Sequence, residues 1–261
     1  MDKLDKCFGE YKIHKKLCKV FSNIRQSFHI RKKGIMKRTK LKDRLLPPYT
    51  KGEEIFNMVS HIVGGGIGIA VAALCIVKSF LIHDAYAIVA SFIYGVSMVV
   101  LYTMSSIYHG LIHITAKKVF QVIDHCAIFL LIAGTYTPIA LCSIREYNTA
   151  LGWCLFGFVW AMAALGITLN AVDLKKYSLF SNVCYIALGW CVIFIVNHAI
   201  KAISMNGFWW LLAGGIAYTV GAVLYGIAGK WKIKYVHSIF HLFVILGSLL
   251  QFFAIIFYVL V

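Results

Sequence analysis

The feature that most constrains this chain is a series of long stretches that are almost free of Asp, Glu, Lys and Arg. A helix of about 20 apolar residues can cross a hydrocarbon core of about 30 Å. With 61% hydrophobic residues, the composition is not that of a water-soluble globular protein. The sequence therefore predicts an all-α membrane protein, with seven transmembrane helices over residues 55–79, 86–112, 119–143, 150–172, 178–200, 207–229 and 235–260.

Basic residues are concentrated ahead of the first of these stretches. Of the 26 Lys and Arg residues, 16 lie in residues 1–51, and they account for most of the net charge of +16. We expect residues 1–50 to form a cytoplasmic tail that contacts anionic lipid headgroups, followed by a transmembrane domain over residues 51–261. The spacing of apolar residues between Ile13 and Phe28 is consistent with an amphipathic helix on the membrane surface or with a mostly disordered arm. Because the tail is tethered to a bilayer, no nucleic-acid partner is expected.

The distribution of charge between the expected loops predicts the orientation. Loops on the side of the tail hold seven lysines, whereas the opposite loops hold Lys78, Arg145 and Lys201. Because cytoplasmic loops carry an excess of Lys and Arg, we expect a cytoplasmic N-terminus and an extracytoplasmic C-terminus. The protein is then a multi-pass protein of the cell (plasma) membrane. The seven lysines are Lys117, Lys118, Lys175, Lys176, Lys230, Lys232 and Lys234.

Four ionisable residues fall at a common depth in three of the expected helices. His109 precedes the Lys117 loop, Asp124 follows it, and His237 and His241 follow Lys234. At 1.5 Å per residue, all four lie within roughly 5–12 Å of the cytoplasmic loops. Ionisable residues inside a membrane are costly and typically functional. The sequence therefore predicts a polar site at the cytoplasmic end of the bundle.

The residue types in this layer favour a Zn²⁺ site. His237 and His241 are four residues apart and share one helix face. Three imidazoles leave a fourth tetrahedral position for water, as in catalytic zinc sites. We expect Asp124 to orient or deprotonate that water, and Ser105, one turn from His109, to hold the water or an oxyanion. The spacing of His237 and His241 alone has an alternative explanation, in which the two side chains pack against each other without binding a metal.

A second polar stripe lies at the start of the first expected helix. Glu54, Asn57 and His61 are spaced at i, i+3 and i+7 and thus share one face. They are predicted to orient the metal ligands or to gate the metal cavity. Alternatively, Glu54 is stabilised by the positive, N-terminal end of its helix dipole, and Asn57 forms hydrogen bonds with neighbouring helices. Four other histidines lie nearer loops or lack partners at useful spacing, and we interpret them as structural or solvated: His83, His113, His125 and His198.

The stretches EEIFNMVSH, SSIYH, DHCAIFLLIAGTYTP and HSIFHLFVILGS occur in this order between residues 53 and 248. They resemble the bacterial hemolysin III proteins of the progestin and adipoQ receptor (PAQR) family, whose wider superfamily includes the alkaline ceramidases. The resemblance covers residues 50–261 and implies a seven-helix bundle with a cytoplasmic N-terminus. It implies zinc bound by His109, His237 and His241, with Ser105 and Asp124 in the family's serine and aspartate positions. The basic tail lies outside the resemblance.

Three functions follow as hypotheses. The first is a zinc-dependent hydrolase that acts on an ester or amide bond of a membrane lipid. The second is a pore-forming or channel protein with cytolytic activity, against which the lack of a repeated ring of charges counts. The third is a non-catalytic sensor of membrane lipid homeostasis, in which zinc has a structural role. The pairing of Ser105 and Asp124 with three histidines favours the hydrolase.

Overall fold

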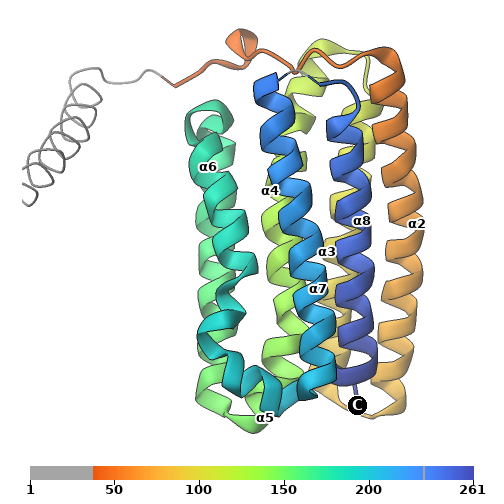
Figure 1. The fold of residues 1–261 in the computed structure, drawn as a ribbon, viewed down its shortest axis with the longest axis vertical. Coiled ribbons are helices and arrows are strands. Elements are labelled where there is room, and N and C mark those ends of the chain that lie inside the picture. Colours follow the sequence, from red (N-terminus) through yellow and green to blue (C-terminus); the bar gives the residue numbers. More distant parts are fainter. Residues whose placement is uncertain (1–37, 232) are drawn as a thin grey trace, which may run out of the picture. The chain divides into compact units, whose positions relative to one another are not determined.

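Residues 38–231 and 233–261 are described by the computed structural model, so the amphipathic helix expected between Ile13 and Phe28 lies outside the described residues. Within these ranges the chain forms helices and no strands, and the long helices run side by side (Figure 1). Their bounds are η1 Leu41–Asp43, α2 Lys51–Leu81, α3 Ala85–Gly110, α4 Ile114–Pro138, η2 Ile139–Ile144, α5 Arg145–Tyr147, α6 Thr149–Gly189, η3 Cys191–Ile195, α7 Val196–Trp231, α8 Val236–Ala254 and η4 Ile255–Val259.

Polar caps at the helix starts explain where several helices begin. Thr50 and Glu53 form a reciprocal capping box at the start of α2, in which each side chain binds the other residue's backbone N–H. Asp84 caps α3 by accepting a hydrogen bond from the backbone N–H of Tyr86 at 2.9 Å. Asn148 caps α6 in the same way. These caps satisfy backbone N–H groups that have no partner within the helix.

Five helical segments within the described residues are long and apolar enough to cross a membrane. They are Lys51–Leu81, Ala85–Gly110, Ile114–Tyr147, Thr149–Gly226 and Val236–Val259. The fourth contains 78 residues, which as one straight helix would extend about 120 Å, about four times the thickness of a hydrocarbon core. This segment therefore cannot be a single straight crossing.

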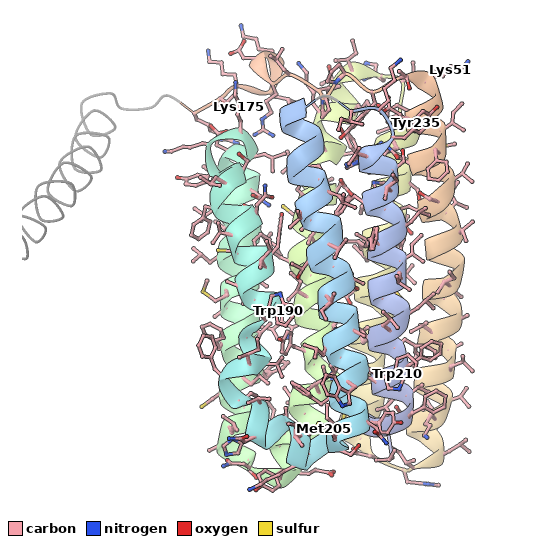
Figure 2. The ribbon with its side chains drawn as sticks, in the orientation of Figure 1. Lys51, Lys175, Trp190, Met205, Trp210 and Tyr235 are labelled. Atoms are coloured by element: carbon pink, nitrogen blue, oxygen red, sulfur yellow. The ribbon has the colours of Figure 1, made fainter. Side chains whose placement is uncertain are left out.

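The backbone of the 78-residue segment leaves the helical conformation at Asp173 (φ −158°, ψ 92°) and at Ser204 (φ 64°, ψ 167°). Each residue also caps the helix that follows it. The Asp173 carboxylate accepts from the backbone N–H of Lys176 at 3.2 Å, and the Ser204 hydroxyl accepts from that of Gly207 at 3.4 Å. Lys175 and Met205, which follow the two breaks, lie at opposite ends of the bundle (Figure 2).

The bundle is apolar outside and partly polar inside. Phe92, Val183 and Phe194 expose 59%, 58% and 90% of their surface, which suits contact with lipid rather than water. Inside, the Tyr102 hydroxyl donates to Ser248 at 2.7 Å, and the Tyr218 hydroxyl lies 2.8 Å from the same oxygen. Pairing of buried hydroxyls is necessary because lipid offers no hydrogen-bond partners. Polar side chains thus gather between the helices, where a site can form.

Candidate metal centre

Three histidines from two helices meet at one end of the bundle. His109 is near the C-terminal end of α3, and His237 and His241 lie in the first two turns of α8. Each offers one nitrogen, and these nitrogens lie within 4.8 Å of one another. The Nε2 atoms of His237 and His241 are 3.1 Å apart. Among the described residues, this cluster can hold a metal ion.

The hydrogen bonds of His109 fix which of its nitrogens faces the cluster. Its Nδ1 lies 2.7 Å from a carboxylate oxygen of Glu54. Its Nε2 is buried and has no hydrogen-bond partner within the described part of the chain. A carboxylate on one imidazole nitrogen, with the other nitrogen left for a metal, is the common arrangement of metal-binding histidines. The buried, unpaired Nε2 is therefore what a metal ligand requires.

His241 is arranged in a similar way. Its Nδ1 lies 3.5 Å from the hydroxyl of Ser60 in α2, which leaves Nε2 to face His237. The imidazole of His61 stacks on that of His241, with ring centroids 3.7 Å apart. Neither His61 nitrogen has a hydrogen-bond partner among the described residues. His61 thus packs against a candidate ligand and lies outside the three-histidine cluster.

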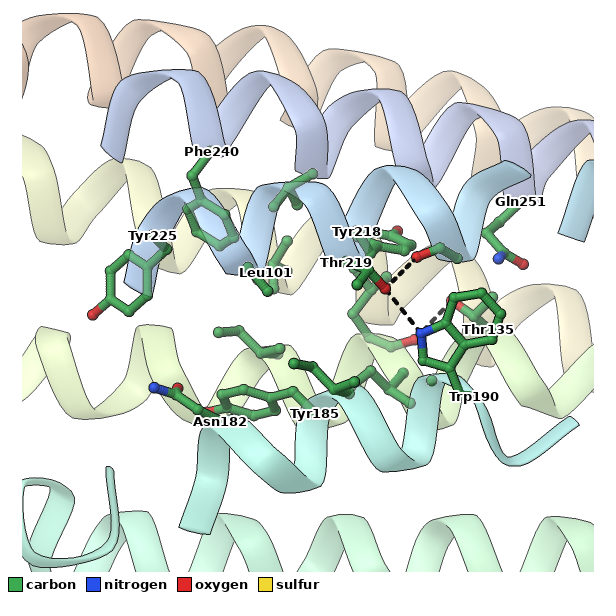
Figure 3. Close-up of a pocket in the computed structure, with 18 of the residues that line it drawn as sticks. Leu101, Thr135, Asn182, Tyr185, Trp190, Tyr218, Thr219, Tyr225, Phe240 and Gln251 are labelled. Atoms are coloured by element: carbon green, nitrogen blue, oxygen red, sulfur yellow. Dashed lines mark hydrogen bonds between the residues drawn. The ribbon is translucent and has the colours of Figure 1, made fainter. Parts of the chain in front are cut away.

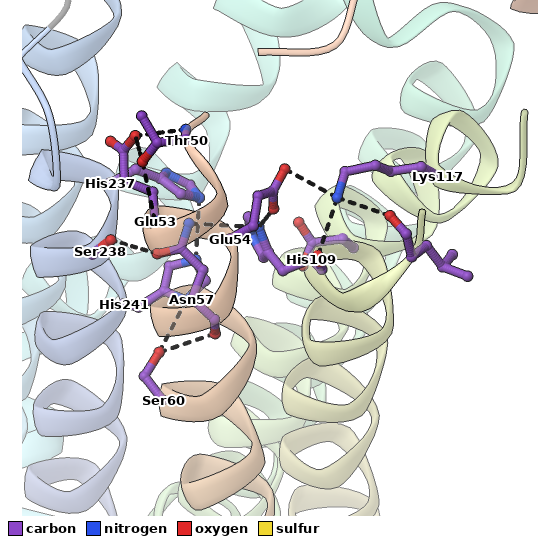
Figure 4. Close-up of polar contacts among 12 residues, drawn as sticks. Thr50, Glu53, Glu54, Asn57, Ser60, His109, Lys117, His237, Ser238 and His241 are labelled. Atoms are coloured by element: carbon purple, nitrogen blue, oxygen red, sulfur yellow. Dashed lines mark hydrogen bonds and ion pairs between the residues drawn. The ribbon is translucent and has the colours of Figure 1, made fainter. Parts of the chain in front are cut away.

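Glu54 connects His109 to a lysine from the next helix. One carboxylate oxygen of Glu54 contacts His109, and the other lies 3.0 Å from the Lys117 ammonium (Figure 4). Lys117 also donates to the backbone carbonyls of His109 and Leu111, at 3.1 and 3.2 Å. The Lys117 and Glu54 side chains are 11% and 19% exposed, so their ion pair is more shielded than one at a protein surface. This pair neutralises the carboxylate that holds His109.

Asn57 ties the first helix to the other two. Its side-chain carbonyl accepts from the Ser238 hydroxyl of α8 at 2.7 Å, and its amide nitrogen lies 3.5 Å from Nδ1 of His109. Asn57 is fully buried. The structure therefore places Glu54 and Asn57 against His109, and His61 against His241. All three face inward from α2, as their shared stripe predicted.

A cavity of about 330 Å³ opens beside the cluster. Its wall includes His237, His241, Ser105 and Asp124 at the metal-centre end. From there it extends between the helices past Tyr225 and Tyr185 to Trp190 and Gln251 (Figure 3). Most of its wall area is apolar, and side chains such as Thr135, Asn182 and Thr219 add polar groups along its length. The arrangement suits an elongated apolar molecule with a polar group near the histidines.

Ser105 and Asp124 both reach this cavity from neighbouring helices. Ser105 is buried on α3, one turn before His109, and its hydroxyl is a polar neighbour of the Asp124 carboxyl on α4. Asp124 also lies 3.6 Å from Nδ1 of His125. The sequence-predicted pair is therefore brought together at the same end of the cavity as His237 and His241.

Sequence reasoning missed three residues that contact this region. The sequence predicts Lys117 to be a loop charge, yet it pairs with Glu54. The sequence predicts a structural or solvated role for His125; its Nδ1 does lie 2.8 Å from the Gln121 carbonyl, but the side chain also lines the cavity. Tyr49, just before α2, stacks on His237. The adjacency of His125 to Asp124 was an available signal, whereas nothing in the local sequence indicates the contacts of Lys117 or Tyr49.

Comparison with known proteins places most of the chain in one group. Residues 49–252 match the family model described as haemolysin-III related. Hemolysin-3 of Bacillus cereus is 39% identical over 209 residues, which cover 80% of this chain and 92% of that protein. The hemolysin-3 homolog of Bacillus subtilis is 37% identical over 211 residues, covering 80% and 96%. The human monocyte to macrophage differentiation factor is 28% identical over 193 residues, covering 69% and 76%.

The Glu54–Lys117 pair predicts an energetic coupling that does not depend on metal. Lys117→Met should lower the free energy of unfolding because the shielded Glu54 carboxylate loses its counter-charge. In a Glu54→Gln background the same change should cost about 0.5–3 kcal/mol less. The wild-type protein, the two single variants and the double variant are unfolded in detergent micelles. Circular dichroism then gives the four free energies of unfolding from which the coupling is calculated. Lys78→Met, at the other end of α2, is the control, and its effect on the free energy of unfolding should be the same with and without Glu54→Gln. If the effect of Lys117→Met were also the same in both backgrounds, the coupling would be contradicted.

Proposed function

Since the chain belongs to the haemolysin-III-related family, we propose that it is a zinc-dependent hydrolase that cleaves an ester or amide bond of a membrane lipid. It is a multi-pass membrane protein of the cell membrane. One observation carries the proposal: two of the clustered histidines, Ser105 and Asp124 line the same end of a long, mostly apolar cavity. A buried cluster alone would suit a structural metal, but the cavity gives a lipid access to it.

Zinc suits the donor set because imidazole nitrogens are among its preferred ligands, and a three-histidine site leaves one position open. His109, His237 and His241 would hold it. When bound, zinc supplies a Lewis acid that polarises a carbonyl group and lowers the pKa of a water molecule. The carboxylate of Glu54 orients His109, and the ion pair with Lys117 keeps that carboxylate in place.

The remaining polar residues provide the proton transfers of hydrolysis. Asp124 accepts a proton from the attacking water, whose oxygen bonds to the carbonyl carbon of the lipid. The carbon–oxygen bond of an ester or the carbon–nitrogen bond of an amide then breaks, and the same proton goes from Asp124 to the leaving alcohol or amine. The Ser105 hydroxyl donates a hydrogen bond to the developing oxyanion. The apolar walls of the cavity hold the hydrocarbon part of the lipid.

The proposed topology is seven membrane spans, with the N-terminus in the cytoplasm and the C-terminus outside. The helix breaks at Asp173 and Ser204 support it, since each falls between two of the stretches expected to span the membrane. Lys175 lies at the same end of the bundle as Lys51 and Tyr235, and Met205 lies at the opposite end. The histidine cluster, which adjoins Tyr235 in sequence, then faces the cytoplasm.

Labelling of single cysteines tests this topology. In a chain whose eight native cysteines are replaced, Lys201→Cys should react with a membrane-impermeant maleimide on intact cells. Lys175→Cys should react only after the cells are permeabilised, because the two positions lie on opposite sides of the membrane. The cysteine-free parent controls for background. Reaction of both positions from the same side would contradict the proposed spans, and a reversed pattern would contradict the orientation.

The metal centre itself is tested by metal content. The protein purified in detergent should contain about one zinc ion per chain, because three converging histidines form a single site. His109→Ala and His241→Ala should each remove it, whereas His83→Ala, an exposed histidine outside the cluster, should not. Inductively coupled plasma mass spectrometry gives the ratio. A folded wild-type protein that neither contains nor takes up zinc would contradict the proposed centre.

Catalysis is tested separately from metal binding. Asp124→Asn should lower lipid turnover by about 10²–10⁴-fold, the usual contribution of a general base, while zinc is retained. Asp84→Asn, which changes a helix cap away from the cavity, is the matched control. Turnover is followed by mass spectrometry of membrane lipid extracts. Zinc without any turnover would favour the non-catalytic sensor, and dye release from protein-containing liposomes would favour the pore.

A further inference from the structure

The three clustered histidines differ in how their rings are oriented. His109 is held by Glu54, and His241 faces the Ser60 hydroxyl, in both cases through Nδ1. Nδ1 of His237 is buried and has no hydrogen-bond partner among the described residues. A metal-binding histidine normally has such a partner, which fixes its ring. His237 must therefore be oriented by other contacts.

Aromatic rings surround His237 in place of that hydrogen bond. The ring of Tyr49 stacks on the imidazole, with centroids 4.9 Å apart and planes 17° from parallel. Tyr225 and Phe240 pack against it at larger tilts, with centroid separations of 5.3 and 5.6 Å. Tyr49 also lies 5.8 Å from the His109 ring. Among these aromatic residues, Tyr49 is the one that comes from outside the long helices.

Tyr49 belongs to a segment, residues 39–50, that we call the strap. The strap crosses the end of the helices near the start of α2 (Figure 1). At its beginning, the backbone N–H of Thr39 donates to Asp173 at 2.7 Å. Near its middle, Lys118 of α4 donates to the Lys42 carbonyl at 2.8 Å. The strap is thus fixed to the helix break in α6 and to α4.

The end of the strap is also fixed. The capping box of Thr50 and Glu53 joins it to α2, and the second carboxylate oxygen of Glu53 accepts from the backbone N–H of Tyr235 at 2.8 Å. Pro47 and Pro48 precede Tyr49 and restrict the backbone there. The Tyr49 ring is therefore held over His237 by a constrained backbone rather than by chance packing of a loose loop.

The phenol of Tyr49 is suited to packing rather than to proton transfer. Burial, together with the neighbouring Tyr225 and Tyr108 and the negative charges of Glu54 and Asp124, raises the pKa of the Tyr49 hydroxyl well above its ordinary value. The side chain stays neutral at physiological pH. Its ring can lie beside the histidines without adding a charge.

We propose that Tyr49 is a positioning residue of the metal centre, which orients His237 by ring stacking, and that the strap closes this end of the centre. A bound metal then leaves through this end of the bundle only when the strap is displaced. This inference rests on the proposed zinc site. It assigns a role to the last residues of the basic tail, directly ahead of the first long helix.

The rate at which a chelator extracts zinc tests the proposal. Zinc-loaded protein in detergent is mixed with 4-(2-pyridylazo)resorcinol in excess, and release is followed by absorbance. Tyr49→Leu should speed release about 10–100-fold, the usual effect of losing a partner that orients a metal ligand. Tyr49→Phe should release zinc at the wild-type rate because the ring is retained. Tyr147→Leu, at the other end of the bundle, is the matched control.

A second variant keeps the test decisive if Tyr49→Leu does not fold. Lys118→Met removes the anchor at Lys42 and should speed release in the same direction. Wild-type release rates for Tyr49→Leu, or for Lys118→Met where Tyr49→Leu does not fold, would overturn the proposal, as would fast release from Tyr49→Phe. Wild-type protein without zinc would instead overturn the metal centre, and this inference with it.

Discussion

The structure depends on the pairing of polar side chains at one end of a bundle whose outer surface is apolar. Hydrocarbon supplies no hydrogen bonds, so a polar group among these helices must find its partner in the protein. The contact of Glu54 with both His109 and Lys117 meets this requirement and joins α2, α3 and α4 at one point. Asn57 extends the network to α8 through Ser238. The same contacts that hold the helix ends together also place three imidazoles beside one another.

Much of this arrangement could be predicted from the sequence. The histidines converge because α3 ends and α8 begins at the same side of the bundle. His109 lies one residue before the end of α3 at Gly110, and His237 lies one residue after the start of α8 at Val236. Counting residues from the nearby lysines places both histidines at one depth. Glu54, Asn57 and His61 face inward because their spacing places them on one side of α2. The stretch expected over 55–79 is seen as Lys51–Leu81, longer at its start because Thr50 caps the helix. Helical periodicity and chain position were sufficient for these features.

Contacts made by long side chains and by irregular backbone could not be predicted in this way. The sequence places Lys117 in a loop, but its flexible side chain extends back to Glu54, and no periodicity predicts such a contact. The position of Tyr49 depends on how the strap crosses the helices, which is set by contacts with Asp173 and Lys118 from distant parts of the chain. The cavity also depends on tertiary packing, since its wall is assembled from several helices.

The central claim is that His109, His237 and His241 together form a zinc site. X-ray absorption at the zinc edge of the purified protein tests this claim most directly, because it reports the atoms bound to the metal. We expect three imidazole nitrogens at about 2.0–2.1 Å, together with a light-atom ligand in the remaining position. Sulfur ligands at about 2.3 Å would assign the metal to cysteines instead and would contradict the account.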